Sequence, residues 1–118
     1  MRILMVAALA MMASAALADE VDDAHRLAVS GRDSYWNCLA REYQNESNKG
    51  LSGPDFTSLI ARVCPSERQN FRVSLVDFLS LQFPNLDSGA HMTTANNAIA
   101  AAQKDVVTAF INHKAAAK

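Results

Sequence analysis

Glycine, proline and cysteine are all scarce, with four Gly, three Pro and two Cys among 118 residues. The few scattered Gly residues argue against a Gly-rich phosphate-binding loop. Neither Cys belongs to a CxxC motif, and no two of the three His residues stand three or four positions apart, which argues against a metal site. No GxSxG or HExxH motif is present either. We therefore predict no catalytic residues, no metal and no cofactor.

Charge is almost absent from the start of the chain, where Arg2 is the only charged residue before residue 19. An apolar stretch follows at residues 3–12, and small residues then lead to an Ala-Leu-Ala triplet at residues 16–18. This pattern is typical of a secretory signal peptide that is cleaved after Ala18. Cleavage after Ala15 and an uncleaved membrane anchor are the alternatives that the pattern leaves open.

The remaining segment, residues 19–118, has the size of a single domain. Since Arg2 accounts for one of the eleven Lys and Arg, this segment holds ten of them against twelve Asp and Glu, a net charge of −2. This mildly acidic balance argues against nucleic-acid binding. We interpret residues 1–18 as a signal peptide and residues 19–118 as one secreted, periplasmic α-helical domain, with no stable membrane insertion after cleavage.

Cys38 and Cys64 are the only cysteines, and an even number in an exported chain favours an intrachain disulfide. A closed loop of about 26 residues corresponds to about 3.5 kcal/mol of stabilisation in the chain-entropy description. A metal-binding pair and a reactive thiol are the functional alternatives for these two residues.

The Gly and Pro residues separate long stretches with helical periodicity, and alternating β-branched runs are absent. The pattern predicts an all-α fold, a compact antiparallel bundle of about four helices, two long and two shorter, with one intrachain disulfide. Asp87 or Ser88 is expected to cap the last helix. The helices are expected at residues 19–46, 54–63, 65–83 and 89–113.

Several features of these helices lead to specific expectations. Gly31 weakens the first helix, which we expect to continue through it, although a break with Asp33 as a new cap is the alternative. A tight corner is expected at Cys64, before Pro65. The helix at 65–83 is apolar around most of its second half, so we expect it to be the central element.

The last helix shows a regular stripe of apolar residues that we expect to be buried. His91 and His113 lie near its two predicted ends, and we expect both at the surface. The expected stripe consists of Met92, Ala95, Ile99, Ala102, Val106 and Ala109, with Phe110 beside it.

Three arginines, Arg62, Arg68 and Arg72, surround the predicted corner between the second and third helices. They form either a small anion site or salt bridges to nearby carboxylates, and we favour the salt bridges. The carboxylates expected as partners are Glu67, Asp77 and Glu42.

Three aromatic residues, Tyr35, Trp36 and Tyr43, lie near the first cysteine in the sequence. They either pack in the core, with Trp36 on the disulfide, or line a ligand pocket between helices, and we favour core packing. A homodimer through one of the hydrophobic faces is also compatible with the pattern.

Around the cysteines the sequence contains Trp36-Asn37-Cys38, the segment 60–64 that ends in the second cysteine, and Phe71 after it. These features resemble those of the periplasmic acid-stress chaperone family of HdeA. The similarity covers about a third of the chain, and the cysteines here are closer together than in that family. The resemblance implies a holdase that is activated by acid.

The charge at low pH is compatible with this alternative. With the carboxylates neutral, the segment 19–118 carries +14 from ten Lys and Arg, three His and the α-amino group. Self-repulsion of this size favours opening of a small domain and exposure of its third helix.

Our leading interpretation is a small periplasmic helical protein that is not an enzyme. It would bind a protein or envelope partner, in an envelope-related or stress-related role. The alternatives are the acid-activated holdase and a small-ligand pocket protein or enzyme that uses Tyr35, Trp36 and the three arginines.

Overall fold

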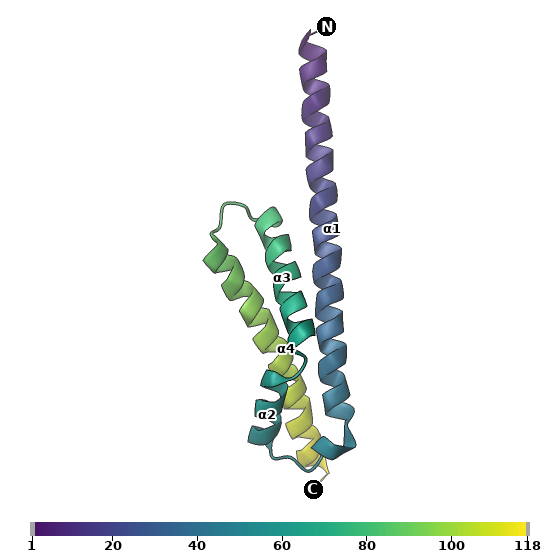
Figure 1. Cartoon of the computed structure of the whole chain (residues 1–118), viewed down its shortest axis with the longest axis vertical. Helices are drawn as coiled ribbons and strands as arrows, with labels where there is room; N and C mark the ends of the chain where they lie inside the picture. The colour runs from purple at the N-terminus through teal and green to yellow at the C-terminus, as the bar shows by residue number, and fades with distance from the viewer. Residues whose placement is uncertain (1, 118) are drawn as a thin grey trace.

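The computed structural model describes the backbone of residues 2–117 and the side chains of residues 17–117 (Figure 1). No strand occurs in the backbone of residues 2–117. The prediction of an all-α fold with two long and two shorter helices is therefore confirmed. The helical elements are α1 (Arg2–Gln44), η1 (Glu46–Asn48), α2 (Gly53–Arg62), α3 (Pro65–Gln82) and α4 (Ser88–Ala116).

The helices form an antiparallel arrangement in which α2 and α3 share one direction. Figure 1 shows α1 and α4 running toward one end of the molecule, whereas α2 and then α3 run back toward the other. α1 packs mainly against α3, and α4 contacts the other three helices. Because α1 extends beyond the other helices at its N-terminal end, the molecule is 78 Å long and 24 Å wide.

The predicted signal peptide forms the N-terminal part of α1. Its side chains up to residue 16 lie outside the described part of the structure, so the signal peptide and its cleavage after Ala15 or Ala18 stay predictions. Within the described residues, no helix combines the length and the hydropathy of a membrane span.

α1 continues through Gly31, as expected, and it ends at Gln44, two residues earlier than expected. Gly31 is buried where α1 meets α3. A Cβ atom at this position would lie 2.8 Å from Ser74 Oγ and 3.1 Å from Phe71 Cα. The residue that weakens the helix locally is therefore the one that lets the two backbones approach closely.

Capping side chains and one unusual backbone conformation set the N-terminal ends of α2, α3 and α4. Ser52 and Asp87 each accept a hydrogen bond from a backbone N–H in the first turn of α2 and α4, which confirms Asp87 as a cap. Cys64 adopts a left-handed conformation with φ of 58° directly before Pro65. The predicted corner between α2 and α3 is therefore present, and it lies at the disulfide.

The large core residues gather at the end of the bundle where α2 packs on α4. Phe56 and Phe110 stack with their ring centroids 3.8 Å apart. Tyr35, Leu39 and Ile60 are fully buried in the same cluster. Burial of each large apolar side chain contributes about 1.5–3 kcal/mol. The other members of the cluster are Cys64, Phe71, Ile99, Ala102 and Val106.

Toward the turn between α3 and α4 the buried residues are small or polar. They are Ala24 and Ala28 of α1 with His91 and Ala95 of α4. Several large apolar side chains in this half of the bundle are exposed, and Leu27 is the most exposed of them, at 65%. The others are Val73, Leu81, Phe83, Leu86 and Met92.

The third helix is the central element in one respect, because it packs against both α1 and α4. It is only partly buried, however, and Phe71 is its only buried residue among those described. The facing residues Ala24, Ala28 and Ala95 are too small to enclose the apolar side chains of α3. These side chains therefore remain partly in contact with solvent.

The buried stripe of α4 differs from the predicted one at both ends. Met92 and Ala109 are exposed, and His91 and Phe110 are buried in their place, because the stripe steps by four residues at each end. The prediction that His91 lies at the surface is therefore wrong. Its side chain is 3% exposed, and its Nε2 atom lies 3.1 Å from the carbonyl oxygen of Phe83. His113 is exposed, as expected.

Candidate interaction groove and the disulfide corner

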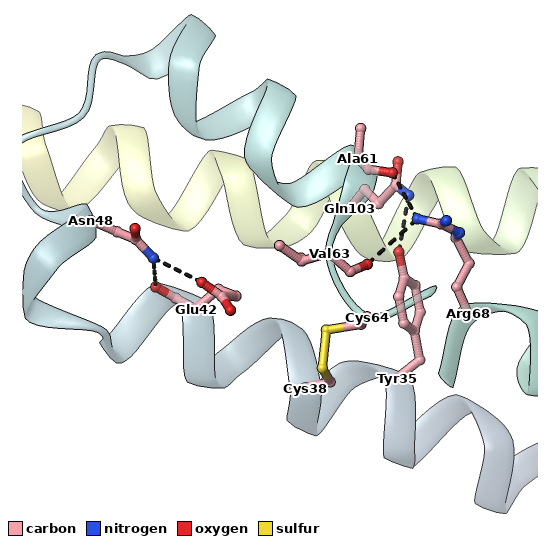
Figure 2. The surroundings of a disulfide bond; sticks show 9 residues. All are labelled: Tyr35, Cys38, Glu42, Asn48, Ala61, Val63, Cys64, Arg68 and Gln103. Atoms are coloured by element: carbon pink, nitrogen blue, oxygen red, sulfur yellow. Dashed lines mark hydrogen bonds between the residues drawn. A yellow bond between two sulfur atoms is a disulfide. The ribbon is translucent and has the colours of Figure 1, made fainter. Parts of the chain in front are cut away.

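The disulfide joins the C-terminal part of α1 to the corner between α2 and α3 (Figure 2). Cys38 and Cys64 are bonded with their Cα atoms 6.2 Å apart, which confirms the predicted pairing. A carboxylate oxygen of Glu67 lies within 4.8 Å of both sulfur atoms. Because the sulfur atoms are bonded to each other, this oxidised corner offers no thiolate to a metal.

Arg68 stabilises the same corner from the first turn of α3. Its guanidinium donates hydrogen bonds of 2.7 Å to the carbonyl of Ala61 and 3.4 Å to that of Val63 (Figure 2). These carbonyls lie at the C-terminal end of α2, where the helix leaves its last acceptors without backbone partners. Arg68 is therefore a side-chain cap of α2, and its positive charge also suits the negative end of that helix.

The other two arginines have different surroundings. The Nε atom of Arg72 donates to Asn96 Oδ1 on α4 at 2.9 Å, and another nitrogen of the same guanidinium bonds to Gln69. Arg62 is exposed in the last turn of α2. The three guanidinium groups thus have different roles: that of Arg68 caps a helix, that of Arg72 links α3 to α4, and that of Arg62 lies at the surface.

The salt bridges predicted for these arginines are wrong. The acceptors of Arg68 are backbone carbonyls and those of Arg72 are side-chain amides, and none of the three arginines forms an ion pair with Glu67, Asp77 or Glu42. Glu42, one of the expected partners, accepts a hydrogen bond from Asn48 Nδ2 at 2.9 Å instead. Within residues 17–117 the ion pairs are Arg26–Asp23, Arg32–Asp33 and Lys49–Glu46, and all are exposed.

The three aromatic residues near the first cysteine differ in how deeply they are buried. Tyr35 is fully buried, and its hydroxyl oxygen accepts a hydrogen bond of 2.9 Å from Gln103 Nε2 (Figure 2). Trp36 is partly buried and packs against the core cluster. Tyr43 lies further along α1, against the ring of His113. Tyr43 also packs against the core cluster, so all three aromatic residues contribute to the core, as favoured, and the hydroxyl of Tyr35 is satisfied within the protein.

A groove of about 690 Å³ lies between α1 and α3, in the half of the bundle with the small core residues. Its volume falls in the range of ligand-binding clefts. Ala24 and Leu27 form its apolar wall on α1, and Val73 and Leu81 form the one on α3. Leu27, Val73 and Leu81, three of the exposed large apolar residues of this half, therefore line a single concave site.

The rim of this groove is acidic. Glu20 and Asp23 lie on its α1 side and Asp77 on its α3 side. Asp23 pairs with Arg26, whereas Glu20 and Asp77 form no ion pair with any residue between 17 and 117. The groove thus combines apolar walls with at least two carboxylates whose charge is not compensated by a neighbouring side chain.

A second cavity, of about 430 Å³, lies at the opposite end of the bundle. Tyr43 and Phe110 contribute aromatic surface to it, and Lys49, His113 and Lys114 contribute basic groups. Two helix C-termini meet at this end, and their negative partial charges offset this basic character. The cavity therefore shows no clear preference for the charge of a ligand.

The groove was not predicted, because it depends on how two helices pack and not on the pattern of either one alone. One signal was nevertheless present in the sequence. The second half of α3 is apolar on more faces than two neighbouring helices can cover, and Val73 and Leu81 belong to that excess. An apolar excess of this kind indicates that part of the helix surface is not covered within the chain.

Comparisons with models of known protein families, with curated proteins and with solved structures gave no match.

Proposed function

We propose that this protein is exported to the periplasm, loses residues 1–18 there, and binds a protein partner without catalysing a reaction. The N-terminal pattern of the sequence supports export. The α1–α3 groove supports binding, and it is the observation that carries the proposal. Apolar side chains gathered around one concave site are a common feature of grooves that bind a partner.

The distribution of the core supports the same conclusion. The end with Phe56, Phe110 and the disulfide is well packed and supplies stability. The other end buries mainly alanines while Leu27 and Val73 remain 65% and 48% exposed. Burial of these side chains in an interface with a partner would stabilise the complex, because they are exposed to solvent in the isolated chain.

Export is tested by the mass of the protein recovered from the periplasmic fraction of an expressing Gram-negative cell. We expect a chain that begins at Asp19. Recovery of only the full-length chain, from the cytoplasm, would refute this part of the proposal.

The binding site is tested by photo-crosslinking in living cells. A photoreactive amino acid replaces Val73 in the groove or, as the control, Ile111 near the opposite end, which has a similar exposure of 45%. We expect a discrete crosslinked product from position 73 and none of that size from position 111. Identical patterns from both positions would contradict the groove as the binding site.

The acid-activated chaperone is the second candidate function, and the thinly packed end of the bundle is the observation that favours it. That end is where opening would first expose the apolar residues of α3. Aggregation of a denatured client protein, measured with and without this protein at pH 2.5 and pH 7, separates the two functions. Suppression only at pH 2.5 supports the chaperone, and no suppression at either pH rejects it.

A further inference from the structure

The chemistry of the groove also defines the kind of partner that it fits, provided that the proposed function is correct. We infer that the α1–α3 groove binds a cationic amphipathic helix of another protein. The groove has apolar walls from two helices and an acidic rim. A helix whose apolar stripe lies on these walls would place Lys or Arg residues on its flanks opposite the rim.

The positions of the acidic groups support this orientation. Glu20 stands on α1 and Asp77 on α3, so carboxylates flank the groove on both helices that form it. Leu27 and Val73 contribute exposed apolar surface from the same two helices. A bound helix can therefore bury its apolar face and pair its basic groups on either side.

The same charges disfavour other occupants. In a symmetric dimer through this groove, the carboxylates of one copy would face those of the other, and like charges across an interface are unfavourable. An anionic lipid surface would be repelled for the same reason. For a basic partner, both the apolar contact and the electrostatic attraction favour binding.

The test uses protein expressed from the full-length sequence and two synthetic helical peptides with the same Leu stripe. One peptide carries Lys on its flanks, and the other carries Glu at the same positions. We expect the Lys peptide to bind with an affinity at least tenfold higher than the Glu peptide. We also expect this preference to shrink as salt is raised from 50 to 300 mM, because exposed charges are screened.

Two pairs of matched variants locate the site. Asp77→Lys should weaken binding of the Lys peptide about fivefold, whereas Asp105→Lys, the same charge change at an exposed position of α4, should leave it within about twofold. Val73→Ser should also weaken binding, and Ile111→Ser should not. All four side chains are exposed, so the fold is expected to survive, and circular dichroism checks this.

The outcomes separate this inference from the proposed function. Equal binding of the two peptides, with Val73→Ser still weakening both, would overturn the cationic partner but retain the groove as a binding site. Crosslinking at position 73 combined with no binding of either peptide would likewise overturn the inference alone. Dimerisation of the wild-type chain that Val73→Ser abolishes would identify a second copy as the occupant and overturn it as well.

Discussion

Replacement of Gly31 by alanine provides a sharp test of how α1 packs on α3, because two effects of opposite sign meet at this position. In an open helix, Gly→Ala stabilises by about 1 kcal/mol through helix propensity. Here the added Cβ would lie 2.8 Å from Ser74 Oγ and 3.1 Å from Phe71 Cα. The hydroxyl of Ser74 can rotate, but it would lose its hydrogen bond to the carbonyl of Asn70.

The backbone contact cannot be relieved in this way, because Phe71 Cα moves only if the helices separate. Overpacking of a closely packed contact costs about 1–3 kcal/mol. We therefore expect Gly31→Ala to destabilise the oxidised protein by about 1 kcal/mol net. For a domain of this size, that corresponds to a melting temperature lower by about 4–8 °C.

Thermal unfolding followed by circular dichroism measures this difference. Ser34→Ala, at an exposed position of the same helix, is the control for propensity and should change stability by less than about 0.5 kcal/mol. Gly31→Ala combined with Ser74→Ala should recover part of the loss, because the shorter side chain removes one of the two contacts. A higher melting temperature for Gly31→Ala would refute the close approach of α1 and α3.

Three further predictions concern the disulfide corner and the end of the bundle near the turn between α3 and α4, where the buried residues are small or polar. Replacing Cys38 and Cys64 by serine should lower the free energy of unfolding, measured in urea, by about 3 kcal/mol, and an unchanged midpoint would contradict the structural role of the bond. Arg68→Ala should cost about 1 kcal/mol in the same assay through loss of the α2 cap, whereas Arg62→Ala should cost less than about 0.5 kcal/mol, and equal costs would argue against capping. His91→Leu should cost about 1–3 kcal/mol because it removes the side-chain partner of a backbone carbonyl, and a neutral effect would show that the histidine is not needed there.

The helices could be predicted because their signals are local. Pro65 and Asp87 marked boundaries through their own backbone or hydrogen-bonding preferences, and these boundaries hold in the structure. The disulfide could be predicted because only two cysteines are present. In each case, the information lies in a residue and its immediate neighbours.

The errors concern contacts between helices. Periodicity placed Met92 in the stripe of α4, although the helix presents His91 to the carbonyl of Phe83. Charge suggested a carboxylate partner for Arg68, although the corner presents backbone carbonyls that need a donor. Both outcomes depend on where the chain turns in space, which a pattern within one helix does not contain.

Gly31 is a residue whose local effect was predicted correctly, although its packing role could not be predicted from the sequence. Its low helix propensity was correctly weighed as a local cost, and the helix does continue through it. What makes the residue suitable is the approach of Phe71, forty positions later in the chain. A local preference and a distant contact act on this residue together, and only the first can be read from its neighbours.

The uneven core leads to a last prediction, on local stability. Within α1, residues 35–39 bury Tyr35 and Leu39 beside the disulfide, whereas the buried residues of the segment 24–28 are Ala24 and Ala28. Regions with few buried apolar contacts open locally at lower free energy. Backbone amides of residues 24–28 should therefore exchange with deuterium at least tenfold faster than those of residues 35–39, as measured by NMR.

Fraying of α1 from its N-terminal end would also speed exchange at residues 24–28, so a second region of the same end is needed as a control. The amides of residues 92–96 in α4 lie beyond the first turn of their helix, against the same thin core, and should exchange faster than those of residues 99–106. Equal protection along α4 would show that the small residues pack as firmly as the large ones. The groove would then be a rigid surface and not the edge of a region that opens.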